Sequence, residues 1–266
     1  MKFLRYPGGK RRLMAYIAER LPAKADFVGR YFEPFVGGGA VFFDQKPENA
    51  FLSDLNPELI DLYKAIRLYP HKVWETFSGV PVGKESYYQM RDDDIGSKPL
   101  YYRAARTLYL NRTCFKGMWR HNPSGKFNVG YGGEDRRWVV NHENIVEISK
   151  VLKKADIQRA DFSDVFDTIK DGDFIFLDPP YKPGEKDLTE QHYSNGKFTF
   201  ADQERLAKKL TAVSEAKKIK WLMTNSAHPD IKKLYKGLKV TKIPIGTGTR
   251  PGILDKSSNE ILISNY

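Results

Sequence analysis

The stretch Asp173–Tyr181 reads DFIFLDPPY, and it decides how the rest of the chain is interpreted. Its first half is short, apolar and aromatic, which is typical of a buried β-strand. Two prolines end that strand, because proline donates no backbone N–H to a sheet. The strand therefore brings the Asp178 carboxylate, two proline carbonyls and the Tyr181 ring to its carboxyl end, where open α/β sheets bind ligands. This cluster of acceptors beside a flat ring suits a neutral, amine-bearing ring, although an ordinary strand exit remains the alternative.

Composition limits the class of protein. The chain has 266 residues, of which 41% are hydrophobic and 13% aromatic, and this predicts a globular α/β fold with a full core. The single cysteine, Cys114, excludes an intramolecular disulfide, and the five histidines lack the spacing of metal ligands. No apolar run approaches the roughly 20 residues of a membrane span. We therefore expect no metal, no membrane-spanning segment and a cytoplasmic location.

The charge of the chain indicates its partner. Lysine and arginine number 44 against 33 aspartates and glutamates, which gives a formal net charge of +11. An excess of this size favours a polyanion, either nucleic acid or an acidic membrane surface, although solubility alone is the simpler alternative.

A glycine-rich turn precedes the middle of the chain. After a short predicted strand around Arg30–Phe32, the segment Glu33–Gly39 reads EPFVGGG. Glycines at a strand-to-helix turn let the backbone bend sharply and approach a ligand closely. Phosphate binding is the common alternative, but no Gly-Lys-Ser/Thr ending follows, which argues against a nucleoside-triphosphate loop.

A second predicted strand, Ala50–Asn56, contains the acid Asp54 at its end. An acid in this place holds ribose hydroxyls in doubly wound folds. The same residues could instead cap the next helix, with Asn56 as N-cap and Pro57 in the first turn, and both roles can hold at once.

Together these motifs resemble the Dam-type DNA adenine methyltransferases, the D12 class or group alpha, in their order along the chain. Tyr6–Lys10 (YPGGK) is similar to the N-terminal segment of that family, and Glu33–Gly39 to its S-adenosylmethionine motif. Asp54 resembles its ribose-binding acid, and Asp178–Tyr181 its catalytic motif. Four motifs in the right order are a far more specific signal than any one of them.

The resemblance implies a seven-stranded, Rossmann-like methyltransferase sheet, with a catalytic domain made of residues 1–69 and 141–266. A small helical, hairpin-bearing target-recognition domain would be inserted at 70–140. The implied function is site-specific transfer of a methyl group from S-adenosylmethionine to the exocyclic amine of adenine in double-stranded DNA, which leaves S-adenosylhomocysteine. The adenine would flip out of the duplex and stack on Tyr181. We expect a monomer, with a weak dimer on DNA as the alternative.

The resemblance also assigns site residues. The catalytic residues would be Asp178, Pro179, Pro180 and Tyr181. The residues expected to bind the cofactor are Tyr6, Pro7, Gly8, Gly9, Lys10, Glu33, Pro34, Phe35, Gly37, Gly39, Asp54, Leu55, Asp161, Phe162 and Asp178. Among them, Asp161 would accept from the cofactor's adenine amine, and capping of the helix that begins near Ser163 is the alternative.

The segment Tyr101–Trp138 is basic and aromatic, a combination that supplies phosphate contacts and base stacking. Within it, Tyr101, Ala105, Leu108 and Tyr109 are predicted to form the buried stripe of a helix. The following loop, residues 111–122, is rich in glycine, turn and charged residues, so we expect it outside the core.

Loop 111–122 resembles the DNA-reading hairpin loop of Dam-type enzymes. There Arg120 aligns with an arginine that reads a guanine, and Met118 with an apolar wedge, while Arg5 aligns with a lysine that touches a base edge. Lys116 and Phe115 replace the asparagine and tyrosine of the GATC-specific enterobacterial enzyme, which weakens any prediction of that site. The residues expected to bind DNA are Arg5, Arg112, Lys116, Met118, Arg120, Asn122, Lys126 and Arg137.

Two alternatives stay open. Within the class, the substrate could be the exocyclic amine of cytosine, although Asp178 favours adenine because the cytosine enzymes usually carry serine there. Outside the class, the chain could be a catalytically silent nucleic-acid-binding homologue.

Overall fold

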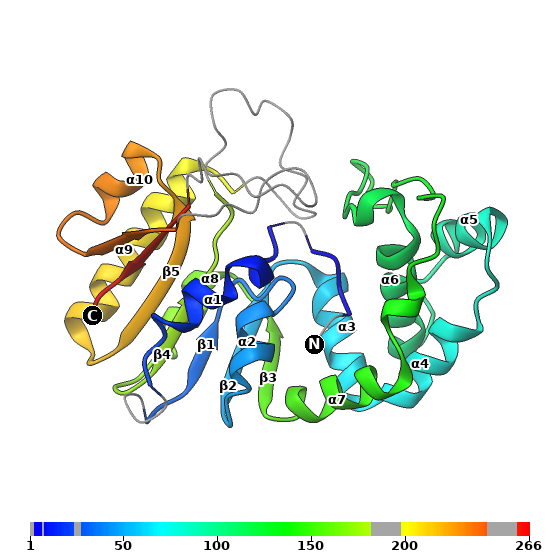
Figure 1. Cartoon of the computed structure of the whole chain (residues 1–266), viewed down its shortest axis with the longest axis horizontal. Coiled ribbons are helices and arrows are strands. Elements are labelled where there is room, and N and C mark those ends of the chain that lie inside the picture. Colours follow the sequence, from blue (N-terminus) through cyan, green and yellow to red (C-terminus); the bar gives the residue numbers. More distant parts are fainter. Residues whose placement is uncertain (1–2, 7, 24–27, 182–197, 244–259) are drawn as a thin grey trace. The chain divides into compact units, whose positions relative to one another are not determined.

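The computed structural model describes residues 3–6, 8–23, 28–181, 198–243 and 260–266 (Figure 1). These residues form two compact units. The first unit contains residues 3–6 and 54–159, and the second contains the remaining described residues. The predicted insertion at 70–140 lies inside the first unit, which also takes in 54–69 and 141–159.

A seven-stranded sheet carries its strands in the order β3-β2-β1-β4-β5-β7-β6. Strand β1 pairs in parallel with β2 and β4, and β4 pairs in parallel with β5, whereas β7 is antiparallel to both β5 and β6. The chain order reverses between β1 and β4, which is where open α/β sheets bind ligands. The predicted mixed, mostly parallel α/β sheet is confirmed. Its strands are β1 (Tyr31–Glu33), β2 (Ala50–Asp54), β3 (Ala155–Arg159), β4 (Phe174–Leu177), β5 (Lys220–Ser226), β6 (Lys239–Lys242) and β7 (Glu260–Ser264).

The position of β4 in the sheet explains why apolar residues occupy every position of the strand instead of every second one. It lies between β1 and β5, and all four of its residues are buried. A strand that is covered on both faces needs apolar side chains at every position. The register places Leu177 beside Met223 of β5, and the two prolines that follow end the ladder.

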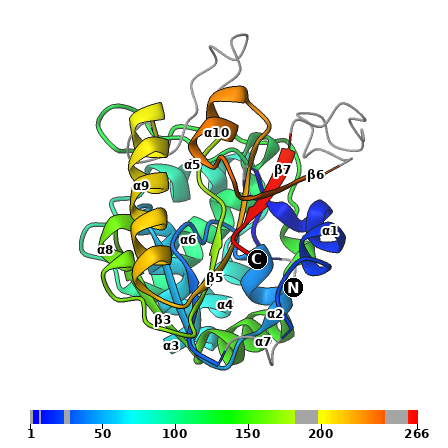
Figure 2. The same cartoon turned by 90° about the vertical axis from the view of Figure 1, so that its left-hand side faces the viewer.

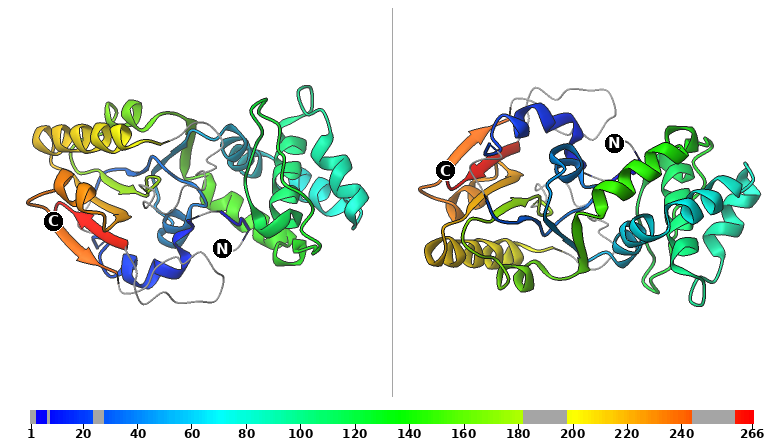
Figure 3. Two further views of the ribbon diagram at one scale, coloured as in Figure 1. Left: turned by 90° about the horizontal axis from the view of Figure 1, so that it is seen from above. Right: turned by 90° about the horizontal axis from the view of Figure 1, so that it is seen from below.

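Helices cover both faces of the sheet in the second unit. Helices α8 and α9 contact each other, and their apolar side chains, such as Phe162 and Leu206, join the core with Ile175 and Trp221 (Figure 2). Helix α1 lies on the opposite side of the sheet (Figure 3). The helices of this unit are η1 (Lys10–Leu13), α1 (Met14–Ala18), α2 (Ala40–Gln45), α8 (Phe162–Phe166), α9 (Phe200–Ala216) and α10 (Pro229–Leu234).

The first unit is mainly helical, and α6 packs against α3, α4 and α5. Asn56 caps α3, as predicted, because its side chain accepts from two backbone N–H groups of the first turn. Three members of the predicted α6 stripe are buried, and Tyr101 is partly exposed. The helices are α3 (Pro57–Leu68), α4 (Pro70–Gly79), α5 (Lys84–Asp92), α6 (Leu100–Thr113), η3 (Phe115–Gly117), η4 (Arg137–Val139) and α7 (His142–Leu152).

The prediction that residues 111–122 lie outside the core is wrong for much of the segment. Residues 111–113 end α6, and Asn111, Arg112 and Trp119 are all buried. Asn111 can be buried because its amide exchanges two hydrogen bonds, of 2.8 and 2.6 Å, with the backbone of Arg5. Beyond α6 the chain forms an irregular hairpin, with bridges from 114 to 131 and from 121 to 127.

Candidate active site

The Asp178 carboxylate lies just beyond the end of β4 and is held by two donors on one oxygen. Lys10 Nζ lies 2.8 Å from Asp178 Oδ1, and the Thr224 hydroxyl donates to the same oxygen over 2.7 Å. The Lys10 side chain is only 5% exposed and the Asp178 side chain 22%. Burial of the lysine is tolerated because its charge is paired and because Nζ also donates to Gly8 O over 2.7 Å.

The aromatic ring of the same segment also contacts the lysine. Lys10 Nζ lies 4.7 Å from the centroid of the Tyr181 ring, which is the geometry of a cation–π interaction. Lys10 therefore contacts both the first and the last residue of the Asp178–Tyr181 segment. The two intervening residues differ in burial: Pro179 is buried, and Pro180 is partly exposed.

The carbonyl of Pro180 is held by a buried network that the sequence analysis missed. Gln203 Nε2 donates to Pro180 O over 2.7 Å, and Asn225 Nδ2 donates to Gln203 Oε1 over 3.1 Å. Thr224 and Asn225 could have been found, because they follow the short apolar run Trp221–Met223 just as Asp178 follows its own apolar run. Gln203 ends the segment Phe198–Gln203 (FTFADQ), which also resembles the Dam-type family, but the sequence assigned it no role.

The glycine-rich turn links β1 to α2 with an unusual backbone. Gly37 and Gly39 have φ angles of 46° and 63°, a region that side-chain-bearing residues rarely adopt. The turn is fixed at both ends, since Val36 N donates to Ser53 O and Gly39 N donates to Val36 O. Its backbone can therefore approach a ligand without an intervening side chain at either glycine.

Glu33, at the start of this turn, is a buried acid. Burial raises the pKa of Glu33 to about 8, and the Asp178 charge adds to the rise, whereas a hydrogen bond from Tyr31 opposes it. The Tyr31 hydroxyl lies 2.7 Å from Glu33 Oε2, and burial also raises the pKa of Tyr31. At neutral pH the carboxyl is therefore mostly protonated, and a cationic ligand beside it would favour the ionised form.

Asp161 caps α8, as the alternative reading predicted. Its carboxylate accepts from Ser163 N over 2.9 Å and from Arg205 Nη1 over 2.7 Å. Burial acts to raise the pKa of Asp161, but the hydrogen bonds from Arg205 and Ser163 outweigh it and lower that pKa. The next residue, Phe162, lies under the Arg205 guanidinium and packs on Phe35 with ring centroids 5.4 Å apart.

Four further residues predicted to bind a cofactor lie near turns. Asp54 ends β2, and its Oδ1 accepts from Asn56 N over 3.0 Å, while Leu55 is exposed. Gly9 is exposed just before η1, and Tyr6, in the first unit, packs edge-on against Trp119 with centroids 5.7 Å apart. Pro7 lies outside the described residues.

In the first unit, Arg120 has a preset side chain. Its Nε donates to Asn128 Oδ1 over 2.8 Å, and Nη2 donates to Asn128 O over 3.3 Å, while the residue stays partly exposed. Asn122 anchors the neighbouring turn, because its side chain accepts from Lys126 N over 2.9 Å. The Lys126 side chain is exposed.

Arg5 packs against η3, the short helix that contains Lys116. A Cβ added at Gly117 would come within 2.8 Å of Arg5 Nε, so the Arg5 side chain packs directly on that glycine. Lys116 is exposed and has a φ angle of 53°, which is rare for a residue with a side chain. Met118, on the other side of Gly117, is partly exposed.

Two arginines that are predicted to bind DNA have partners within the protein. Arg137 pairs with Asp135 over 2.7 Å, and its Nη1 donates to the backbone carbonyls of Phe77 and Val80. Arg112 is buried, and this burial lowers its pKa to about 10, helped by Arg5 and by Arg136. These contacts favour a structural role for both side chains.

The motifs, the sheet order and the strand-end site agree with one family. Residues 6–249 match the D12 class N6 adenine-specific DNA methyltransferases. The chain belongs to this family.

Several proteins that are similar in sequence to this methyltransferase are also named as methyltransferases or methylases. It is 33% identical to a type II methyltransferase of Lactococcus lactis subsp. cremoris, over 99% of this chain and 95% of the relative. It is also 33% identical to a type II methyltransferase of Methanocaldococcus jannaschii, over 99% and 98% of the two chains. A DNA adenine methylase of Vibrio cholerae is 29% identical over 91% and 87%.

Among solved structures, a precorrin 8W decarboxylase of Methanobacterium thermoautotrophicum is 12% identical, with 97% of this chain and 91% of that one covered. The two structures superpose with a TM-score of 0.40.

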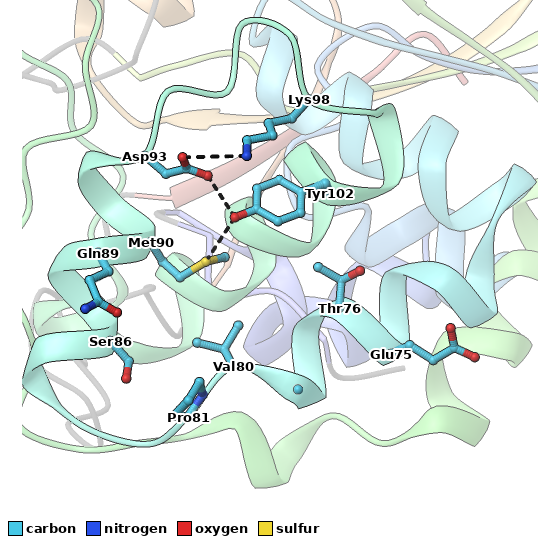
Figure 4. A pocket seen from close by; sticks show the side chains of 11 residues that line it. Glu75, Thr76, Val80, Pro81, Ser86, Gln89, Met90, Asp93, Lys98 and Tyr102 are labelled. Carbon is cyan, nitrogen blue, oxygen red and sulfur yellow. Dashed lines mark hydrogen bonds and ion pairs between the residues drawn. The ribbon is translucent and has the colours of Figure 1, made fainter.

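The helical unit of the methyltransferase also contains a hollow of about 550 Å³ (Figure 4). Residues of α4, α5 and α6 line it, and none of the predicted site residues is among them. Two acids line it, Glu75 and Asp93, and Asp93 is engaged by Tyr102 and Lys98 (Figure 4).

In the described part of the methyltransferase, no helix is long and apolar enough to cross a membrane. The same residues include no group of three or more His, Cys, Asp or Glu side chains placed to hold a metal ion.

Proposed function

We propose that this methyltransferase is a site-specific enzyme that transfers a methyl group from S-adenosylmethionine to the exocyclic amine of adenine in double-stranded DNA. The observation that carries the proposal is the Asp178 carboxylate at the end of β4, with Oδ1 held by Lys10 and Thr224 and with Tyr181 close by. This arrangement provides acceptors for an amine and a ring for stacking, at the switch point of the sheet.

The chemistry of the adenine amine explains why such acceptors are needed. Its lone pair is delocalised into the ring, so the nitrogen is a poor nucleophile. Acceptors on Asp178 and on the Pro179 carbonyl would hold both N–H groups and favour a pyramidal nitrogen, which stabilises the charge that develops there. Because the amine is unreachable inside a duplex, the base would flip out and stack on Tyr181.

The residues near β1 fit the proposed cofactor. S-adenosylmethionine, when bound, supplies the methyl group on a positively charged sulfur. The buried Glu33 carboxyl and the backbone at Gly37 and Gly39, which carries no side chain, suit a cationic ligand that lies close to the chain. Asp54 would hold the ribose hydroxyls. Asp161 would accept a hydrogen bond from the amine of the cofactor's adenine, beside Phe162. It can do so because a carboxylate has acceptor sites left after it caps a helix. The remaining residues proposed for this site are Tyr6, Pro7, Gly8, Gly9, Lys10, Pro34, Phe35 and Leu55.

For DNA, the exposed and partly exposed side chains support a contact surface in the first unit. Arg120 would read a guanine through its planar fork, and Arg5 would reach a base edge. Met118 would act as an apolar wedge, and exposed lysines would contact phosphates, which position the duplex without specifying its sequence. The residues that we propose for direct contact are Arg5, Lys116, Met118, Arg120, Asn122 and Lys126. We propose that the enzyme acts as a monomer in the cytoplasm, where it binds DNA of the nucleoid.

A direct test uses the purified protein, unmethylated genomic DNA and labelled S-adenosylmethionine. Digestion to nucleosides should yield N6-methyl-2′-deoxyadenosine, and single-molecule sequencing of the product DNA should show one recognition sequence. Methylation of the cytosine amine would instead support the alternative substrate. Binding of DNA without any transfer, together with no calorimetric signal for S-adenosylmethionine, would support a silent homologue.

Replacement of Asp54 by alanine is expected to weaken S-adenosylmethionine binding by about 1.5–3 kcal/mol, the size of a lost hydrogen bond to a charged group. Isothermal titration calorimetry would measure the change. Because Asp54 also accepts from Asn56 N, the melting temperature should be measured alongside. An unchanged Kd would show that Asp54 only stabilises the turn before α3.

Replacement of Arg120 by alanine is expected to cost about 1–3 kcal/mol of interaction free energy with the cognate duplex. It should also relax the discrimination between guanine and other bases at one position of the site. The matched control is Lys126→Ala, in an exposed residue of the same hairpin. That variant should weaken binding to all duplexes equally. It should also reduce the slope of log K against log salt concentration by about one unit. Methylation of cognate and singly substituted duplexes at two salt concentrations separates the two effects. A uniform loss in Arg120→Ala would make that arginine a phosphate contact.

A further inference from the structure

We propose that three buried polar side chains, Thr224, Asn225 and Gln203, position the Asp178–Tyr181 segment for methyl transfer. Thr224 and Asn225 lie at the end of β5, and Gln203 lies near the start of α9, all within the second unit. This proposal rests on the proposed function, because it assigns these side chains a part in that reaction.

Thr224 sets the orientation of the carboxylate. It is fully buried, and its hydroxyl donates to Asp178 Oδ1 over 2.7 Å, the same oxygen that Lys10 contacts. The parallel register that pairs Leu177 with Met223 brings the next residue of each strand, Asp178 and Thr224, together. Two donors on Oδ1 fix the rotation of the carboxylate, which leaves Oδ2 for the N–H of the substrate amine.

Gln203 sets the orientation of the other end of the segment. Its side chain is 1% exposed, and its Nε2 donates to Pro180 O over 2.7 Å. That carbonyl belongs to the peptide group that leads into Tyr181, so the hydrogen bond fixes the plane from which the Tyr181 side chain departs. Asn225, also fully buried, donates to Gln203 Oε1 over 3.1 Å and holds the glutamine amide in this orientation.

The free-energy cost of burying these three polar side chains indicates that they do more than fill space in the core. The preceding residues of β5, from Trp221 to Met223, are buried and apolar, and then two polar residues follow with no exposure at all. Burial of a hydroxyl or an amide costs free energy unless it is hydrogen-bonded. An apolar side chain of the same size would fill the space without that requirement. The polar groups contact the catalytic segment or each other, and a fully satisfied network of this kind restricts local geometry.

The test compares Thr224→Val, which keeps the shape and removes the hydroxyl, with Thr224→Ser, which restores the hydroxyl. Single-turnover methyl transfer to a cognate duplex should slow by at least about tenfold in the valine variant, because a small misplacement of reacting groups is costly. The serine variant should stay within about threefold of the wild-type rate, and S-adenosylmethionine affinity and melting temperature should change little in both.

A second variant, Gln203→Met, tests the other end of the segment. With 2-aminopurine at the target adenine, its fluorescence in the complex should differ from that of the wild type, because the flipped base stacks differently on Tyr181. The matched control is Ser214→Ala, which removes a partly buried hydroxyl of α9 that bonds Leu210 O and Trp221 instead. That variant should show the wild-type fluorescence and rate.

The proposal is overturned if Thr224→Val transfers methyl groups within about threefold of the wild-type rate, or if serine fails to restore the rate. It is also overturned if the loss of rate is matched by an equal loss of cofactor affinity, since that indicates general disturbance. If the wild-type enzyme itself transfers no methyl group to adenine, the proposed function is what fails.

Discussion

Alanine in place of Asp178 should leave a folded protein whose methyl-transfer rate is lower by about 10²–10³-fold or more, the range seen when one preorganised transition-state contact is removed. The loss should fall on turnover rather than on substrate binding, because the carboxylate acts most strongly as charge develops on the amine nitrogen. Single-turnover kinetics with saturating S-adenosylmethionine and DNA would measure it.

Two controls isolate the carboxylate of Asp178. Asp164→Ala removes an exposed acid from α8 and should leave both rate and stability nearly unchanged. Asp178→Asn retains the shape of the side chain, so equal inactivity in that variant would assign the effect to the carboxylate rather than to a cavity. Retention of about a tenth of the wild-type rate by Asp178→Ala would refute the assigned role.

Glu33 should make the stability of the free enzyme fall as pH rises. Burial raises its pKa from 4.5 to about 8, so between these values the folded protein holds a proton that the unfolded chain has released. Stability then decreases with pH across this window, by up to about 1.4 kcal/mol per pH unit. Urea unfolding at several pH values from 5.5 to 8 should show this slope in the wild type and a flatter profile in Glu33→Gln.

Tyr31→Phe provides the matched control for this slope. It removes the hydrogen bond that opposes the rise in the Glu33 pKa but leaves the acid buried, so the slope should persist. S-adenosylmethionine should show the opposite trend, with affinity that increases toward pH 8, because a cationic ligand favours the ionised carboxyl. Parallel stability profiles for the wild type and Glu33→Gln would contradict the buried, protonated state of Glu33.

Local patterns in the sequence were sufficient for the elements that carry the site. The apolar run before Asp178 predicted a fully buried strand, because a central strand needs apolar residues on both faces. Asn56 predicted the start of α3, since an N-cap depends only on backbone groups two and three residues away. The glycines before α2 predicted a turn that the φ angles of Gly37 and Gly39 confirm.

Contacts between distant residues were decided by the tertiary structure. The pairing of Asp178 with Lys10 and Thr224 depends on which strand ends share an edge of the sheet, and no local spacing encodes that. The same holds for Gln203, whose amide can donate to Pro180 O only once α9 packs beside that residue. The burial of Arg112 was likewise decided by folding, because a buried arginine is tolerated where a distant backbone acceptor is supplied, here the carbonyl of Arg136. The sequence by itself thus determined strands β1, β2 and β4 and the cap of α3. Only the tertiary structure decided which polar groups meet, because hydrogen bonds and ion pairs depend on distances in space that packing sets.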